Sequence, residues 1–166
     1  SVRGHDPLLV LVLAGVLVGA LLGACVALLK VLADPYNQLP AITFWLLGSL
    51  AGAAPADLAS ALPAIAFGLI PLWLLRWRVN LLSLGDEEAR AMGVETTRVR
   101  LAVIASATLM TAAAVSISGI IGWIGLVIPH FARLAVGPDF SRLLPVSAIL
   151  GAAFLLAVDT LARTTA

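Results

Sequence analysis

Long apolar runs alternate with short polar segments along this chain. A helix that crosses about 30 Å of hydrocarbon needs roughly 20 predominantly apolar residues. The apolar run at 101–128 is longer than one straight span requires, and Ser-Ile-Ser-Gly at 116–119 predicts a break with a tight turn inside it. The pattern therefore predicts five crossings, at residues 8–29, 58–75, 99–118, 120–136 and 143–161.

Two further segments lie between these runs. Residues 41–54 are apolar but too short to cross, and they are bounded by Pro40 and Pro55. This segment is predicted to be a short helix that is interfacial or re-entrant. Residues 76–100 hold nine of the charged side chains and are therefore predicted to lie in water.

The composition supports a lipid environment. Hydrophobic residues make up 61% of the chain, and the mean hydropathy is +1.09. With 10 Lys and Arg and 9 Asp and Glu among 166 residues, the chain has too few charges to cover a soluble domain. The net charge of +1 gives no indication of a nucleic-acid partner. The predicted fold class is all-α: a polytopic membrane helical bundle with about five transmembrane helices, the short interfacial or re-entrant helix, and a short cytoplasmic helix.

The basic residues predict an orientation. In a chain with five crossings the loops alternate sides, and basic residues concentrate in cytoplasmic loops. Lys30 and Arg163 fall on one side. The other eight basic residues fall on the opposite side: Arg3, Arg76, Arg78, Arg90, Arg98, Arg100, Arg133 and Arg142. The side of residue 1 is therefore predicted to be cytoplasmic and the side of residue 166 extracytoplasmic.

The polar segment contains the signals of a short helix of its own. Asp86 suits an N-cap, and Glu87 and Glu88 follow in the first turn, where the helix dipole favours acidic residues. Gly93 suits the left-handed residue that commonly ends a helix. A capped two-turn helix between two spans is either a contact for a partner or a solvated surface helix.

Small residues recur at a spacing of four. Gly15, Gly19 and Gly23 form one smooth face on the first span, and Gly48 and Gly52 repeat the spacing on the predicted short helix. Such a face admits a close neighbouring helix. It serves either general helix packing or a subunit contact or pathway lining.

Several segments carry a family resemblance. Residues 80–93 read Asn-Leu-Leu-Ser-Leu-Gly-Asp-Glu-Glu-Ala-Arg-Ala-Met-Gly and contain a Glu-Ala-x-x-x-Gly loop. Phe-Trp-Leu-Leu-Gly-Ser at 44–49 and Leu-Leu-Pro at 143–145, with Asp-Thr-Leu-Ala-Arg at 159–163, match further. Residues 118–133 carry a turn motif at Gly119, Gly122, Gly125, Pro129, His130 and Arg133. Together these segments resemble the iron-siderophore, haem and vitamin B12 permease family of ABC importers (FecCD type).

The resemblance covers nearly the whole chain and implies its role. It implies that residues 1–166 are part of a single permease domain, a fragment covering about the fifth to ninth of the family's spans. The implied partners are a second permease copy, separate ATP-binding cassette ATPase subunits that hydrolyse ATP, and an extracytoplasmic substrate-binding protein. The implied location is the bacterial inner (cytoplasmic) membrane. Coupling to the ATPase falls on Asp86, Glu87, Glu88, Ala89, Arg90 and Gly93.

Arg163 and His130 are polar residues that could bind a partner or a metal ion. Asp159 precedes Arg163 by four residues, a spacing that favours a local ion pair. The family resemblance instead implies that Arg163 docks acidic residues of the binding protein. His130 lacks a second ligand at metal-binding spacing, so no metal site is predicted.

No residue pattern indicates catalysis or a cofactor. Lys30 is the only lysine and follows Leu29, so the Gly-Lys-Ser/Thr of a P-loop is absent from the sequence. Two other functions remain as alternatives: an ATPase-independent secondary transporter or channel, which broken helices would also suit, and a structural membrane scaffold. Ion coupling would need ionisable groups within the membrane, and only Asp159 qualifies.

Overall fold

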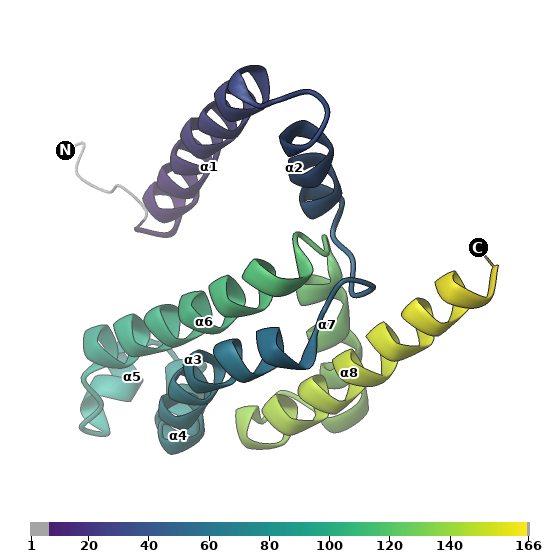
Figure 1. Cartoon of the computed structure of the whole chain (residues 1–166). Coiled ribbons are helices and arrows are strands. Elements are labelled where there is room, and N and C mark those ends of the chain that lie inside the picture. The colour runs from purple at the N-terminus through teal and green to yellow at the C-terminus, as the bar shows by residue number, and fades with distance from the viewer. Residues whose placement is uncertain (1–6, 166) are drawn as a thin grey trace. The chain divides into compact units, whose positions relative to one another are not determined.

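The computed structural model describes residues 7–165, and all regular secondary structure in that range is helical (Figure 1). The helices in chain order are α1 (Pro7–Leu32), α2 (Gln38–Leu47), α3 (Pro55–Leu74), α4 (Arg76–Leu82), α5 (Asp86–Ala91), α6 (Thr96–Ser118), α7 (Ile124–Val136) and α8 (Phe140–Thr165). The predicted all-α fold class is confirmed. Helix α4 lies in the polar segment and was not predicted from the sequence.

Four helices in the described range are long and apolar enough to cross a membrane, namely α1, α3, α6 and α8. They correspond to four of the five predicted spans. The fifth predicted span, residues 120–136, contains the shorter apolar helix α7 of 13 residues. At 1.5 Å per residue this helix is about 20 Å long, so a complete crossing by residues 120–136 stays a prediction.

The break predicted within the long apolar run is confirmed. Helix α6 ends at Ser118, and Gly119 follows with a φ of +67°. Helix α7 begins at Ile124 and not at residue 120, because Trp123 also has a positive φ, of 66°. The residues between the two helices therefore form a loop that is longer than the predicted tight turn.

The extent of α2 differs from the prediction of a helix at 41–54. Asp34 accepts hydrogen bonds from the backbone N–H groups of Asn37 and Gln38, and the helix begins at Gln38. Gly48 follows the last helical residue with a φ of +70°, which ends the helix. Gly48 and Gly52 therefore lie beyond α2, and the prediction that they form a small-residue face on this helix is wrong.

The chain divides into two compact units, Ser1–Phe44 and Trp45–Ala166. In the first unit, the apolar side chains described on α1 are exposed, apart from the half-buried Val26. A Cβ added at Gly15, Gly19 or Gly23 would meet nothing within 4 Å. Their role in packing, subunit contact or pathway lining stays a prediction.

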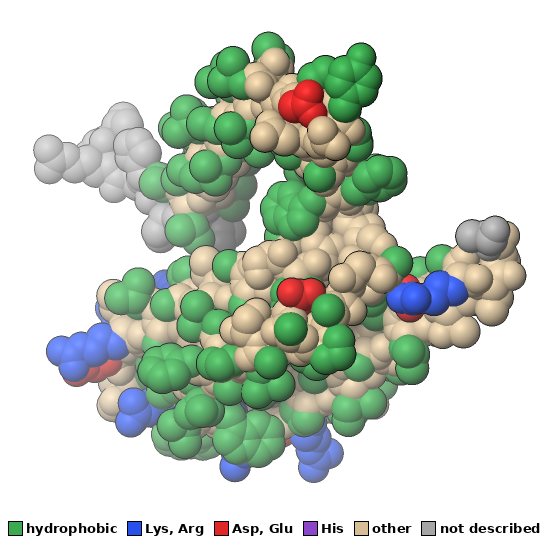
Figure 2. All heavy atoms as spheres, viewed as in Figure 1, with side chains coloured by type: hydrophobic (Ala, Val, Ile, Leu, Met, Phe, Trp, Pro, Cys, Tyr) green, Lys and Arg blue, Asp and Glu red, His purple; other side chains and the backbone are tan. Residues whose placement is uncertain are grey.

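In the second unit, α3 packs along α6, α7 packs along α8, and α4 contacts α8 (Figure 1). Helices α3 and α6 come closest at Gly68, where an added Cβ would lie 2.8 Å from the carbonyl oxygen of Ser106. Ser106 is itself buried. Figure 2 shows apolar side chains over much of the visible face and several Lys and Arg side chains along the lower edge. An apolar surface of this kind suits lipid.

Candidate functional site

The predicted cytoplasmic helix is present as α5, but its first residue differs in role from the prediction. The helix begins at Asp86, and its N-cap is Gly85, with a φ of 116° and no side-chain capping bond. Asp86 is therefore not the N-cap, and this prediction was wrong. Its Oδ1 instead accepts a hydrogen bond from Arg100 Nη2 at 2.9 Å, which forms an ion pair between α5 and α6.

The other two acidic residues of the first turn are exposed. Glu87 and Glu88 lie at the N-terminal end of α5, where the helix dipole favours negative charge. The Glu88 side chain folds back towards the start of the helix: a Cβ added at Gly85 would lie 2.6 Å from its Oε2. The exposed beginning of α5 is therefore acidic.

The end of α5 is fixed by backbone hydrogen bonds. Gly93 has a φ of 79° and donates its N–H to the carbonyl of Arg90 at 2.9 Å. The N–H of Val94 donates to the carbonyl of Ala89 at 3.0 Å. These two bonds form a Schellman motif, in which a left-handed glycine satisfies the last carbonyls of a helix. The prediction that Gly93 ends this helix is confirmed.

One face of α5 is buried in a small apolar cluster. Ala89 is fully buried, and it packs with the buried Val94 and Val99. Partly buried residues from α4 and α6 complete the cluster: Val79, Leu81, Leu82 and Val103. Val94, just after α5, and Val99, on α6, each gain about 1.5–3 kcal/mol from burial in this cluster, whereas an exposed ion pair such as Asp86–Arg100 contributes about 0.2–1 kcal/mol. The cluster that Ala89 joins therefore holds α5 in place more strongly than the exposed ion pair does.

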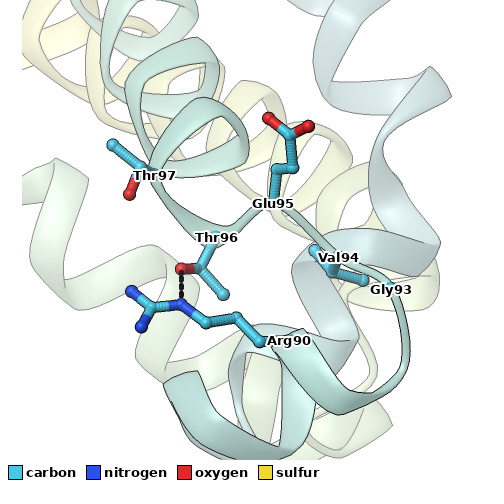
Figure 3. Close-up of a pocket in the computed structure, with 6 residues that line it drawn as sticks. All are labelled: Arg90, Gly93, Val94, Glu95, Thr96 and Thr97. Atoms are coloured by element: carbon cyan, nitrogen blue, oxygen red, sulfur yellow. Dashed lines mark hydrogen bonds between the residues drawn. The ribbon is translucent and has the colours of Figure 1, made fainter.

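A pocket of about 440 Å³ opens beside the end of α5 (Figure 3). Arg90 Nε donates a hydrogen bond of 3.2 Å to Thr96 Oγ1, and the Thr96 residue is only 2% exposed. Glu95 forms an ion pair of 2.8 Å with Arg98. The lining residues are Arg90, Gly93, Val94, Glu95, Thr96 and Thr97. The contact of Thr96 with Arg90 was not predicted from the sequence, since a threonine at a helix start indicates a cap and does not specify a side-chain partner.

Helix α4 connects α3 to α5, and an aromatic and basic surface lies where α3 meets α4. The guanidinium of Arg76 lies over the ring of Trp73, 4.4 Å from its centroid. Trp73 and Trp77 are both exposed. Tryptophan and arginine at the end of a span are typical of a membrane–water interface.

The amide of Asn80 joins α4 to the turn before α8. Asn80 Nδ2 donates to Asp139 Oδ1 at 2.6 Å, and Asn80 Oδ1 accepts the backbone N–H of Phe140 at 2.7 Å. Asp139 Oδ1 also accepts the N–H of Ser141 at 2.9 Å. The hydrogen bond from Asn80, followed by that from the Ser141 N–H, lowers the pKa of Asp139. Sequence analysis missed this contact, although Asp139 directly before a span is a recognisable capping signal.

Two of the segments that carry the family resemblance, residues 44–49 and 118–133, meet at the loop after α6. Gly119 lies against the end of α2: an added Cβ would overlap the carbonyl oxygen of Trp45 and lie 3.0 Å from Gly48 Cα. Ser49 N–H donates to the carbonyl of Ser118 at 2.8 Å. The 44–49 and 118–133 segments are therefore in direct backbone contact. This contact was not predicted, because nothing in the sequence pattern pairs these two segments.

The remaining turn-motif residues have varied surroundings. Added Cβ atoms at Gly122 and Gly125 would meet nothing within 4 Å. Pro129, His130 and Arg133 lie within α7. His130 is exposed, with its ring edge-on to Phe131 at 6.3 Å. Among residues 7–165, no group of three or more His, Cys, Asp or Glu side chains is placed to hold a metal ion.

Arg163 forms the local pair. Its Nε donates to Asp159 Oδ2 at 2.7 Å, one turn earlier on α8. The Arg163 side chain is still 56% exposed, and that of Asp159 is 24% exposed. The pairing of Asp159 with Arg163 is confirmed, while docking of a binding protein by Arg163 stays a prediction.

The apolar helices and the structured polar segment between them define a polytopic helical membrane protein. A model of the FecCD transport family matches residues 1–166, and the chain belongs to this family. The relationship predicted from the motifs is therefore confirmed.

Relatives and a solved structure agree with this assignment. The chain is 44% identical over 164 residues to the cobalamin import system permease protein BtuC of Halobacterium salinarum, covering 99% of this chain and 44% of that protein. It is 40% identical to the molybdate import system permease protein MolB of Haemophilus influenzae, covering 95% and 47%. A solved ABC transporter assigned to the metal-chelate type, in an inward-facing conformation, is 40% identical with a TM-score of 0.90, covering 97% and 54%. The chain thus spans about half the length of the curated relatives it matches.

Proposed function

We propose that the chain is part of the transmembrane permease subunit of a binding-protein-dependent ABC importer for a metal-containing cargo. Residues 1–166 then belong to a single permease domain in the cytoplasmic (inner) membrane. Its partners are a second permease copy, ATPase subunits that hydrolyse the ATP, and an extracytoplasmic binding protein. The observation that carries this proposal is α5, a short helix with a buried face and an exposed acidic end, set between candidate spans α3 and α6.

Helix α5 is suited to transmitting motion because it is fixed on three sides. Ala89 anchors its inner face, the Schellman motif fixes its end, and Asp86 pairs with Arg100 at its beginning. A helix of this length is not stable alone in water, so burial and backbone hydrogen bonds are what keep it folded. A force applied to the exposed Glu87 and Glu88 therefore reaches α4 and α6 without first unfolding α5. We assign these two residues to the ATPase contact.

The pairing of Asp159 with Arg163 on α8 disfavours the secondary-transporter alternative. Ion coupling needs a carboxylate that can bind and release a cation within the membrane. Asp159 was the candidate in the sequence, and its carboxylate is bound to Arg163 at 2.7 Å. A carboxylate already paired with a guanidinium is poorly suited to this task.

The coupling role is tested in the complete permease, assembled with its ATPase subunits and binding protein in liposomes. Glu88→Lys and Gly93→Pro should leave membrane insertion intact and lower the amount of cargo transported per ATP hydrolysed. Proline at 93 can neither adopt the positive φ nor donate the N–H to Arg90. Glu95→Lys, for comparison, makes the same charge change at the start of α6, where it breaks the exposed pair with Arg98, and should lower this ratio less. Normal transport in both variants at normal expression would overturn the proposal.

The orientation is tested by cysteine labelling in a variant whose native Cys25 is replaced by serine. A cysteine at Glu95 should react only with reagents that reach the cytoplasm, and a cysteine at Asn37 should react from outside. Both positions are exposed. Labelling of both from one side would contradict the five-crossing topology.

The cargo class rests on the relatives, whose names specify cobalamin and molybdate. Both cargoes contain a metal, as does the cargo class of the metal-chelate type transporter. The decisive experiment is to isolate the binding protein that docks on the complete permease and to identify its bound ligand by mass spectrometry. A ligand without a metal would contradict this part of the proposal.

A further inference from the structure

Asn80 is placed between the segment that carries α5 and the beginning of α8. Its amide uses both of its functional atoms: Nδ2 donates to Asp139 Oδ1 at 2.6 Å, and Oδ1 accepts from Phe140 N at 2.7 Å. Both contacts are partly buried, and they join residues about 60 positions apart in the sequence. The amide thus binds a side chain and a backbone group of the same turn.

The contact completes the N-terminal cap of α8. The first backbone N–H groups of a helix have no partner within the helix. Asp139 Oδ1 accepts the N–H of Ser141, and the Asp139 carbonyl accepts those of Arg142 and Leu143. The N–H of Phe140, the first residue of α8, is satisfied by Asn80 from another helix. The start of α8 therefore depends on α4 for part of its cap.

Helix α4 is also attached to α5. Leu81 and Leu82, next to Asn80 in the sequence, pack against the cluster formed by Ala89, Val94 and Val99. The beginning of α8 lies beside α4 in Figure 1, and the two helices are in contact. A displacement of α5 is therefore shared by α4, and the Asn80 amide lies at the point where α4 meets α8.

We infer that Asn80 and Asp139 are positioning residues that carry the motion of α5 into α8. This inference rests on the proposed function, in which α5 is the ATPase contact. Motion then leaves α5 by two routes. The cluster around Ala89, the Arg90–Thr96 hydrogen bond and the Asp86–Arg100 pair lead to α6. Helix α4, through the partly buried Asn80–Asp139 contact, leads to α8. Helix α7 packs on α8, so the second route includes it.

An exchange of the two side chains provides the sharpest test. Asn80→Asp places two carboxylates at the 2.6 Å contact and should separate α4 from α8. Asp139→Asn keeps an acceptor for the Asn80 amide and should have a mild effect. In the double variant, the carboxylate introduced at position 80 can accept from Phe140 N–H and from the new amide at position 139, whose oxygen can still accept from Ser141 N–H. The contact is thereby restored with the donor and acceptor exchanged.

The readout is cargo transported per ATP hydrolysed by the complete transporter in liposomes. Asn80→Asp should lower this ratio at least about fivefold, the lower end of coupling between distant sites, while ATP hydrolysis continues. The double variant should recover most of the ratio, which assigns the loss to this contact. A purely structural loss at Asn80 would lower ATP hydrolysis and transport together and leave their ratio unchanged. Asn80→Ala should lower the ratio without a charge clash, so the inference stays testable if Asn80→Asp does not assemble.

The matched control uses a second Asn–Asp contact in the same chain. Asn37 Nδ2 donates to Asp34 Oδ2 at 3.1 Å within the loop between α1 and α2. Asn37→Asp creates a similar carboxylate contact, but within one loop, and should leave the ratio unchanged. An unchanged ratio in both Asn80 variants, or no recovery in the exchange, would overturn the inference and leave the proposed function intact. Absence of ATP-driven transport by the unaltered permease would overturn both.

Discussion

The two ends of α6 are held by different kinds of contact. At its beginning, α6 meets α5 through side chains: the Asp86–Arg100 pair, the Arg90–Thr96 hydrogen bond and the cluster around Ala89. At its end, it meets the last turn of α2 and the residue after it through backbone atoms, where Gly119 lies against the Trp45 carbonyl and Gly48. A helix of 23 residues separates the two regions.

This difference determines how each region responds to change. At the α5 end several side-chain contacts together stabilise the packing, and each exposed ion pair contributes little to the free energy of unfolding. Backbone atoms in close approach leave no space for even one methyl group. The α5 end should therefore tolerate many single substitutions, and the Gly48–Gly119 contact should tolerate almost none.

The largest effect is expected for Gly119→Ala. The added Cβ would overlap the Trp45 carbonyl, and Gly119 has a φ of 67° and a ψ of −164°, a backbone region that is essentially restricted to glycine. Strain and overpacking together should lower the free energy of unfolding of the complete permease by at least about 3 kcal/mol. Denaturant unfolding or the folded yield in detergent measures this loss. Gly52→Ala is the control, because its Cβ would meet nothing within 4 Å, and equal stability of the two variants would contradict the comparison.

A smaller loss is expected at the α5 end for Ala89→Leu. Ala89 is fully buried, so a larger side chain must displace its neighbours, at a cost of about 1–3 kcal/mol. Ala91→Leu adds the same atoms at an exposed position two residues later and should have little effect. Thermal unfolding of the two variants in detergent compares them directly. If Ala89→Leu matches Gly119→Ala, the two ends do not differ as described.

The Asn80–Asp139 contact should respond to acid. The hydrogen bond from Asn80 and that from Ser141 lower the pKa of Asp139 below its ordinary value of 3.8. Folding therefore favours the ionised carboxylate, so its contribution to stability is present above that ordinary pKa and is lost as the pH falls through the lower, folded-state pKa. Unfolding curves between about pH 3 and pH 6 should show a loss of stability below about pH 4. Asp139→Asn should remove this part of the pH dependence, and an unaltered profile would contradict it.

The smallest effect is expected for the Asp159–Arg163 pair. An exposed pair at this spacing stabilises a helix by about 0.2–0.5 kcal/mol, so Arg163→Gln and Asp159→Asn should lower stability equally and slightly. Binding-protein affinity in nanodiscs at low and high salt tests the docking role separately. If Arg163 docks the partner, Arg163→Glu should weaken binding, and reversing the partner's acidic residue should restore it. An affinity that neither salt nor Arg163→Glu changes would leave only the local pair.

The sequence predicted those features that depend on local chemistry. Apolar run lengths located α1, α3, α6 and α8, and the glycine signal located the end of α5 at Gly93. The break after Ser118 also followed from local residue types. The cap of α5 was misassigned because a glycine and an aspartate are adjacent there, and both residue types favour that position.

Contacts between distant segments could not be predicted in the same way. Asn80 and Asp139 are 59 residues apart, and neither residue type specifies a partner. The approach of Gly119 to Gly48 depends on where α2 ends, which the apolar pattern placed at residue 54 and not at Leu47. Such contacts depend on how the helices pack in three dimensions, and the local pattern of one sequence does not specify that packing.

The two left-handed glycines that bracket α5 have a consequence for insertions and deletions. Gly85 and Gly93, with φ values of 116° and 79°, mark the two ends of the helix and so fix the number of residues between them. Successive residues of an α-helix are rotated by about 100° around the helix axis. One residue inserted between Gly85 and Ala89 would turn Ala89 out of the apolar cluster and bring the charged Glu88 towards it. The length of this segment is therefore under stricter constraint than the identity of its exposed side chains.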